Sequence, residues 1–151
     1  MIQDNIDTTT RQPIYPLLAA FAASCLLGTL ATDIVYWWTA DIIWADFSDW
    51  LVSAGVIVGW VTVIVALIEI FALRSARFRQ RSRAYASAMV LALIVIALIL
   101  ATIDMLVHTR DAWTSVVPWG VILSAAVAAL VLVTAYLSRI TDAPAAIEVT
   151  G

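Results

Sequence analysis

Four long apolar stretches, separated by short polar segments, make up most of this chain. They cover residues 15–38, 51–73, 85–107 and 118–137. A helix that crosses a hydrocarbon layer about 30 Å thick needs roughly 20 apolar residues, so each stretch is long enough for one transmembrane helix. We therefore expect one four-helix transmembrane domain at 15–138, between a polar N-terminal tail at 1–14 and a C-terminal tail at 139–151.

The composition supports this assignment and excludes several classes of protein. The chain is 64% hydrophobic and only 13% charged, with a mean hydropathy of +1.00, which a soluble domain of 151 residues would not tolerate without aggregating. Cys25 is the only cysteine, which excludes an intrachain disulfide and a thiolate metal cluster. Nucleic-acid binding has no support, because most basic residues lie in one segment next to the membrane.

That basic segment, residues 74–83, predicts the topology. It contains five of the eight basic residues, namely Arg74, Arg77, Arg79, Arg81 and Arg83. By the positive-inside rule it lies in the cytoplasm, where its arginines would contact anionic lipid headgroups. The prediction is an all-α, multi-pass membrane protein: four transmembrane helices in an antiparallel up-down bundle, with both termini cytoplasmic.

The segment between the first two stretches, residues 39–50, is acidic and carries no arginine or lysine. We expect it to be an outside-facing loop, with a short amphipathic turn on the membrane surface and Asp41, Asp46 and Asp49 in water. Six of the seven tryptophans fall at the predicted outer ends, as in an aromatic belt. These are Trp37, Trp38, Trp44, Trp50, Trp113 and Trp119.

Ionisable residues near the outer ends of the spans are the first candidate site. Asp104 and His108 are four residues apart and therefore share one face of a helix. Asp33 lies at a similar depth near the end of the first span, and Arg110 follows His108 closely. The sequence predicts an outer polar cluster of these residues, either as a structural ion-pair group or as a binding site.

Glu69, about 7 Å inside the cytoplasmic boundary, is the other membrane-embedded acid. An ion pair with an arginine at a neighbouring helix end is the simpler explanation for it, and a proton or cation site is the alternative. Small residues at Ser24, Gly28, Gly55 and Gly59 recur every fourth position and predict close helix contacts. Packing within the bundle is the simpler explanation, and a homo-oligomer interface is the alternative.

Several short segments resemble those of a bacterial family of predicted membrane proteins, domain of unknown function 2231. The segments are residues 13–16, 32–36, 50–55 and 68–71, the last followed by the basic loop. The resemblance implies a four-helix inner-membrane protein, in some relatives joined to Rieske-type redox domains, and no known activity. Asp33 and Glu69 match acids of the family pattern, whereas Gln12, Tyr15 and Tyr85 stand where the family has histidines.

Loss of those histidines bears on cofactors. Membrane haem b most often takes two histidine ligands, and this chain has one histidine, so we expect no haem, no metal and no other cofactor. The residues Gln12, Tyr15, Glu69 and Tyr85 form a second candidate cluster on the inner side. They would either line a small pocket for a quinone or lipid headgroup or serve as interfacial anchors.

Two functional hypotheses follow, and no catalytic constellation supports an enzyme. The first is a non-enzymatic structural or accessory subunit of the bacterial inner membrane, packing against itself or in a larger complex. The second is a small transport or redox-associated module that binds a proton, cation or quinone, through Glu69 or through Asp33, Asp104 and His108. No midplane acid, broken span or inverted repeat favours the second hypothesis.

Overall fold

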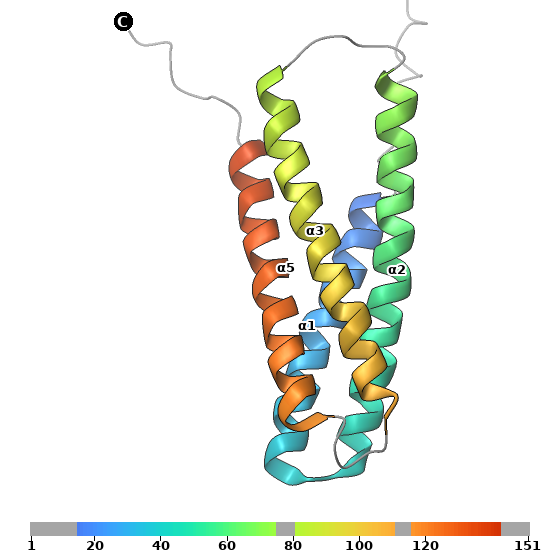
Figure 1. Cartoon of the computed structure of the whole chain (residues 1–151), viewed down its shortest axis with the longest axis vertical. Coiled ribbons are helices and arrows are strands. Elements are labelled where there is room, and N and C mark those ends of the chain that lie inside the picture. The colour runs from blue at the N-terminus through green and yellow to red at the C-terminus, as the bar shows by residue number, and fades with distance from the viewer. Residues whose placement is uncertain (1–14, 75–80, 111–115, 143–151) are drawn as a thin grey trace, which may run out of the picture.

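Each apolar stretch forms one long helix in the computed structural model, which describes residues 15–74, 81–110 and 116–142 (Figure 1). The helices are α1 (Tyr15–Thr39), α2 (Ile42–Arg74), α3 (Arg81–His108) and α5 (Val121–Asp142), with a short π-helix η1 (Val116–Gly120) before α5. Four segments within them are long and apolar enough to cross a membrane: Pro16–Thr39, Ile42–Ile68, Ala88–His108 and Val116–Ile140. The chain is therefore an all-α protein with four membrane-spanning helices.

The start of α2 differs from the sequence prediction. Residues 42–50, expected as a surface loop, form the first turns of α2 and continue into the apolar stretch. Asp41 explains this early start, because its carboxylate accepts a hydrogen bond from the backbone N–H of Ile43 at 3.2 Å and so caps the helix. Ala40, with a φ of 52°, makes the tight turn between α1 and α2.

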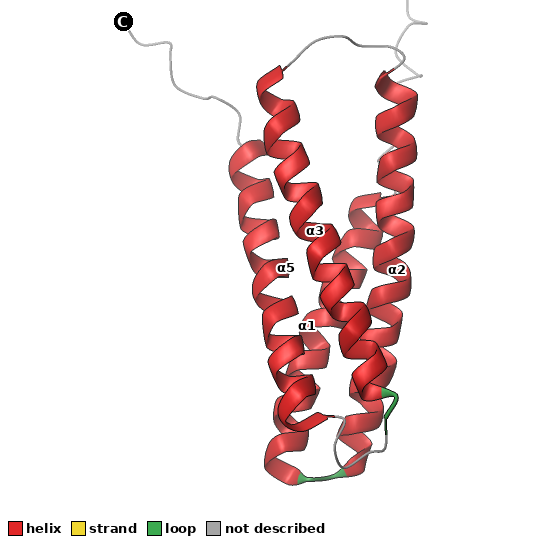
Figure 2. Cartoon of the chain, in the orientation of Figure 1, coloured by secondary structure: helices red, strands yellow, loops and turns green. Residues whose placement is uncertain are grey.

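The two ends of the bundle differ in composition. At the tryptophan end, defined by Trp37, Trp38, Trp50 and Trp119, α1 meets α2 and α3 approaches α5. At the arginine end, α2 finishes at Arg74 and α3 begins at Arg81, and these two helices lie farther apart there than at the tryptophan end (Figure 1). Figure 2 shows that loops contribute little to the described chain, so the helices alone build the interior.

The tryptophan end is closed by a small apolar cluster. Val116 of η1 is fully buried and packs with Tyr36 of α1 and Ala45 of α2. Trp44 covers the same cluster and stacks obliquely on Phe47, with ring centroids 5.9 Å apart. Ala45 lies in the segment that was expected to be a loop, so the early start of α2 is what brings α2 into this cluster.

Close helix approach occurs at three glycines. A methyl group on Gly55 would lie 2.8 Å from Leu26 Cδ2 of α1, and one on Gly28 would lie 3.2 Å from Leu51 Cδ1 of α2. Gly59 faces Leu98 of α3 even more closely. Ser24, which was also expected at a helix contact, does not lie at one within the bundle. Its side chain is exposed, and its hydroxyl donates to the carbonyl oxygen of Ala20 in its own helix.

The interior is a thin column of small and medium side chains. Its central layer consists of Leu26, Val52, Val56, Ala101 and Val127, with one or two residues from each helix. Large apolar side chains instead cover the outside of the bundle, as expected for helices surrounded by lipid. Packing between helices in such a bundle depends on close van der Waals contact rather than on exclusion of water.

Candidate functional site

A cluster of three ionisable side chains lies in the interior near the tryptophan end. His108, the last residue of α3, places its Nε2 3.0 Å from Asp33 Oδ1 of α1. Its Nδ1 lies 3.3 Å from Asp104 Oδ1 and 3.0 Å from the backbone carbonyl oxygen of Asp104, one helical turn earlier. The imidazole ring is thus held between two carboxylates that are 71 residues apart in the sequence but adjacent in space.

All three side chains are shielded from the surroundings. The side chains of Asp33, Asp104 and His108 are 0%, 2% and 1% exposed, respectively. Ionisable groups inside a membrane bundle are costly unless they pair with one another, and in this cluster both ring nitrogens of His108 have an oxygen partner. Asp33 Oδ2 and Asp104 Oδ1 are buried without a hydrogen-bond partner in the part of the chain that the structure describes.

The geometry requires a proton between His108 and Asp33. A backbone carbonyl only accepts hydrogen bonds, so the contact with the Asp104 carbonyl places a hydrogen on Nδ1. A neutral ring with that tautomer would direct the lone pair of Nε2 at Asp33 Oδ1, which is also an acceptor when ionised. The 3.0 Å contact between these atoms is favourable only if a proton lies between them. In this geometry the pair shares one proton, and Asp104 lies beside it as a second carboxyl group.

Apolar layers lie on either side of the cluster along the bundle. Toward the tryptophan end, the cluster of Tyr36, Ala45 and Val116 closes the interior. Toward the arginine end, Ala101 lies one turn before Asp104 and belongs to the central apolar layer. The cluster is thus a buried polar layer between two apolar ones.

Hydroxyl groups surround the same half of the bundle. Ser48 of α2 is fully buried and bonds to Thr32 of α1, with 2.6 Å between the two oxygens. Thr29 donates to the Cys25 carbonyl at 3.1 Å, and Ser124 donates to the Val121 carbonyl at 3.3 Å. The Ser48–Thr32 bond is a second polar link between helices. It was missed from the sequence because Ser48 lies in the segment that was expected to be a loop.

Arg110, grouped with this cluster from the sequence, is not part of it. It follows the end of α3 and its side chain is exposed, with no ion pair to either carboxylate. The backbone turns here, with Arg110 N–H donating to the Val107 carbonyl at 3.2 Å, and this carries the side chain away from the interior. The site is thus a three-residue cluster of Asp33, Asp104 and His108.

The inner candidate cluster falls largely outside the described residues. Gln12 precedes α1, and the basic residues Arg77 and Arg79 lie between α2 and α3, so all three lie outside the described residues. The other members belong to helices, but their side chains are not described; these are Tyr15, Glu69, Arg74, Arg81, Arg83 and Tyr85. The pairing of Glu69 and the lipid contacts of the arginines therefore stay predictions.

Metal binding does not fit the three-residue cluster. No group of three or more His, Cys, Asp or Glu residues in the described part of the chain has a metal-binding arrangement. The reason is visible at His108, where each ring nitrogen already faces an oxygen acceptor at 3.0 Å. A metal ligand needs a free nitrogen lone pair, so the ring is oriented to hold hydrogens instead.

The model of one protein family, described as predicted membrane protein (DUF2231), matches residues 11–143. The chain belongs to this family. The match covers all four helices of this DUF2231 member and includes Asp33, Asp104 and His108. No curated protein and no solved structure matches the chain. The description agrees with the four membrane-spanning helices and assigns no activity, so the chemistry of the site must be argued from its own geometry.

Proposed function

We propose that this protein is a non-enzymatic accessory module of the bacterial inner membrane, and that it binds protons at Asp33, His108 and Asp104. The observation that carries this proposal is the enclosed His108 ring with a carboxylate on each side. A histidine between two acids changes its charge by taking up or releasing a proton, without needing any other ligand. Proton binding would thereby strengthen or weaken the link between α1 and α3.

Enclosure of the cluster favours a binding module over an enzyme. None of its three side chains is more than 2% exposed, so a substrate would have no access to either carboxylate in this conformation. The apolar layers on both sides likewise favour proton storage over conduction, because a conducting path needs a chain of polar groups or water.

In this proposal the tryptophan end faces outward and the arginine end faces the cytoplasm. The positive-inside rule supports this orientation and gives cytoplasmic termini, with the chain crossing four times in an up-down order. Impermeant thiol labelling in intact cells tests it, using Thr39→Cys and Ser75→Cys in a Cys25→Ala background. We expect labelling at position 39 only; labelling at position 75 alone would reverse the orientation.

The proton in the cluster is directly measurable because the chain has one histidine. Selective ¹⁵N-histidine labelling of the protein in lipid bilayers gives NMR signals from His108 alone. If the proton resides on His108, we expect NMR signals from two protonated ring nitrogens. If it resides on Asp33, we expect a carboxylic-acid band in the infrared spectrum, which Asp33→Asn removes. In Asp33→Asn the amide donates to Nε2, so the ring should become neutral, with hydrogen on Nδ1 only.

Asp46→Asn is the matched control, because Asp46 is an exposed acid near the same end of the bundle. It should leave the His108 signals and the infrared spectrum unchanged. A wild-type ring that is neutral, with an unprotonated Nε2 and no carboxylic-acid band at Asp33, would contradict the proposal.

Transport is the competing function, and a flux assay separates it from storage. Vesicles that contain the protein and a trapped pH-sensitive dye should acidify no faster than protein-free vesicles after an external pH drop. Rapid acidification that Asp33→Asn abolishes and Asp46→Asn preserves would instead establish a proton pathway through the cluster.

A further inference from the structure

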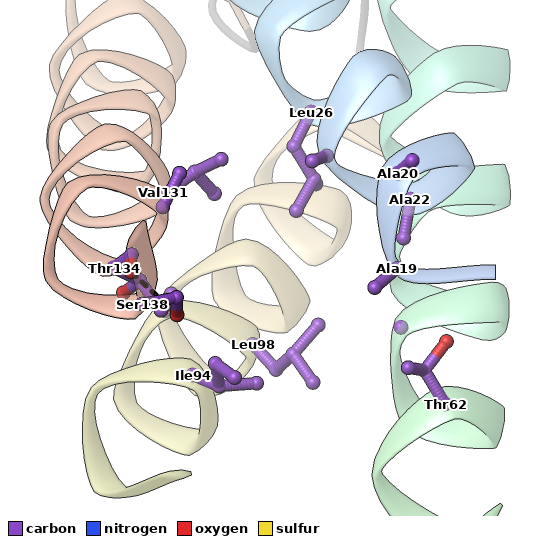
Figure 3. Close-up of a pocket in the computed structure, with 14 residues that line it drawn as sticks. Ala19, Ala20, Ala22, Leu26, Thr62, Ile94, Leu98, Val131, Thr134 and Ser138 are labelled. Atoms are coloured by element: carbon purple, nitrogen blue, oxygen red, sulfur yellow. Dashed lines mark hydrogen bonds between the residues drawn. The ribbon is translucent and has the colours of Figure 1, made fainter. Parts of the chain in front are cut away.

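The bundle contains a cavity of about 290 Å³ in the half nearer the arginine end (Figure 3). All four long helices line it, among others through Ala19, Ala22, Gly59, Ala97, Leu98 and Val131. The small side chains of α1 lie opposite Leu98 and Val131 in Figure 3. The central apolar layer separates the cavity from the His108 cluster, with Leu26 belonging to both the layer and the cavity wall.

The wall of the cavity is chemically apolar. It includes no charged side chain, and its polar groups are the hydroxyls of Thr62, Thr134 and Ser138. Each of these donates to a carbonyl of its own helix: Thr62 to Val58 at 2.7 Å, Thr134 to Leu130 at 2.7 Å and Ser138 to Thr134 at 2.9 Å. Since the hydroxyl hydrogens are already used, these groups offer only acceptor oxygens to a guest, and the wall has no charge with which to bind an ion.

The size of the cavity suits one hydrocarbon chain. An apolar cavity of about 150 Å³ takes up a molecule the size of benzene, and this one is roughly twice as large. Its wall runs from Ala19 to Leu26 along α1 and from Val131 to Ser138 along α5. Each stretch spans seven residue steps, or about 10 Å of helix. The space is long enough for part of a chain and too small for a complete lipid.

The cavity also opens toward the membrane. Ala19, Ala20 and Ala135 line it and are exposed on the outside of the bundle. All three lie within membrane-spanning segments, where the surrounding medium is lipid acyl chains. Alanine at these positions leaves a gap between α1 and α5 that a larger side chain would fill.

We propose that this cavity is a binding site for one acyl chain of a bilayer phospholipid, which enters between α1 and α5. The apolar wall, the occupied hydroxyls and the opening onto the hydrocarbon layer together select this ligand. Bound chain atoms restore the dispersion contacts that an empty space would forfeit. The site is separate from the proposed proton site, so either can fail while the other stands.

Native mass spectrometry tests the site on the full chain, after reconstitution in palmitoyl-oleoyl phosphatidylcholine vesicles and release into detergent. We expect one retained phospholipid per protein, and at least a fivefold smaller bound fraction in Ala135→Phe, whose ring would block the opening. Ala129→Phe is the matched control, because Ala129 is an exposed alanine of the same helix that does not line the cavity. An unchanged His108 NMR signal in both variants verifies that they fold.

Two results would overturn the inference. One is an equal bound fraction in Ala135→Phe, Ala129→Phe and the unmodified protein. The other comes from protein purified directly from cell membranes: if the molecule lost in Ala135→Phe is an isoprenoid rather than a phospholipid, the cavity takes a prenyl chain and the acyl-chain assignment is wrong.

Discussion

The two halves of this bundle solve the problem of buried polar groups differently. Near the tryptophan end, polar side chains bond across helices, as in the contact of His108 with Asp33 and that of Ser48 with Thr32. Near the arginine end, the hydroxyls of Thr62 and Thr134 donate to carbonyl oxygens of their own helices, and a cavity lies between the helices. Polar links across helices join α1 to α3 and to α2 near the tryptophan end, whereas the other half contains a cavity with room for a ligand.

α2 and α3 also diverge toward the arginine end (Figure 1). The hydrogen bond that joins these two helices, from Trp60 Nε1 to Thr102 Oγ1 at 3.2 Å, lies farther along the bundle toward the tryptophan end. The half with the His108 cluster must meet two requirements at once. Each carboxylate must stay beside the ring, and each apolar layer must stay packed. A single substitution there should disturb both. In the half with the cavity, lining side chains have free space beside them, and substitutions should be absorbed more easily.

The largest effect should come from removing the shared partner of both carboxylates. His108→Leu would leave Asp33 and Asp104 buried without a cation. We expect a loss of about 3–5 kcal/mol in the free energy of unfolding, the range found when one partner of a buried ion pair is removed. Reversible unfolding in SDS mixed micelles, followed by tryptophan fluorescence, measures it.

The exposed Asp46 again provides the control for this prediction, since Asp46→Asn should change stability by less than about 0.5 kcal/mol. A loss below about 1 kcal/mol in His108→Leu would mean that the cluster contributes little to holding α1 and α3 together, and the contrast between the halves would disappear.

Truncating one valine in the central layer and one at the cavity wall should give a smaller but clear difference. Val52 is fully buried in the central layer, so Val52→Ala removes two packed carbon atoms and leaves a new void. We expect a loss of about 1.5–2.5 kcal/mol. Val131 is only partly buried and already borders the cavity, so Val131→Ala should cost less than about 1 kcal/mol in the same unfolding assay. Equal losses would contradict the proposed difference in packing.

Adding a methyl group at two glycines tests the same contrast. In Gly55→Ala the new Cβ would meet both Leu26 and Cys25 of α1, which costs about 1–3 kcal/mol of overpacking and exceeds the helix-propensity gain of roughly 1 kcal/mol. In Gly59→Ala the close contact is with one terminal methyl of Leu98, which can rotate into the cavity. We expect net destabilisation at position 55 and a near-neutral result at position 59, and the reverse order would refute the comparison.

The smallest expected effect concerns the second polar link. Ser48→Ala removes the bond to Thr32, whose hydroxyl retains the carbonyl oxygens of Gly28 and Thr29 as acceptors at 3.0 and 2.9 Å. A loss of about 0.6 kcal/mol, typical of hydrogen bonds between membrane helices, is expected. Ser24→Ala is the control, because Ser24 is exposed and bonds only within α1, so its loss should be close to zero.

Local signals accounted for much of the fold. Four apolar stretches of sufficient length predict four helices, and the i, i+4 spacing of Asp104 and His108 predicts that they share a face. The start of α2 was also encoded locally, in the capping residue Asp41, but the aspartates nearby favoured a loop. Asp41 was interpreted as part of an acidic loop, because an aspartate occurs both as the N-cap of a helix and as a surface residue.

What the sequence alone determined is therefore the number of helices, the family and the shared helix face of Asp104 and His108. Only the tertiary structure decided that His108 joins Asp33 through Nε2 and excludes Arg110, because side-chain direction at a helix end depends on how the chain leaves the helix. It also decided that Gly28 and Gly55 pack against leucines of the neighbouring helix, whereas Gly59 and several alanines border a cavity. Small residues permit close approach anywhere along a helix, and the angles between the helices determine where that approach occurs.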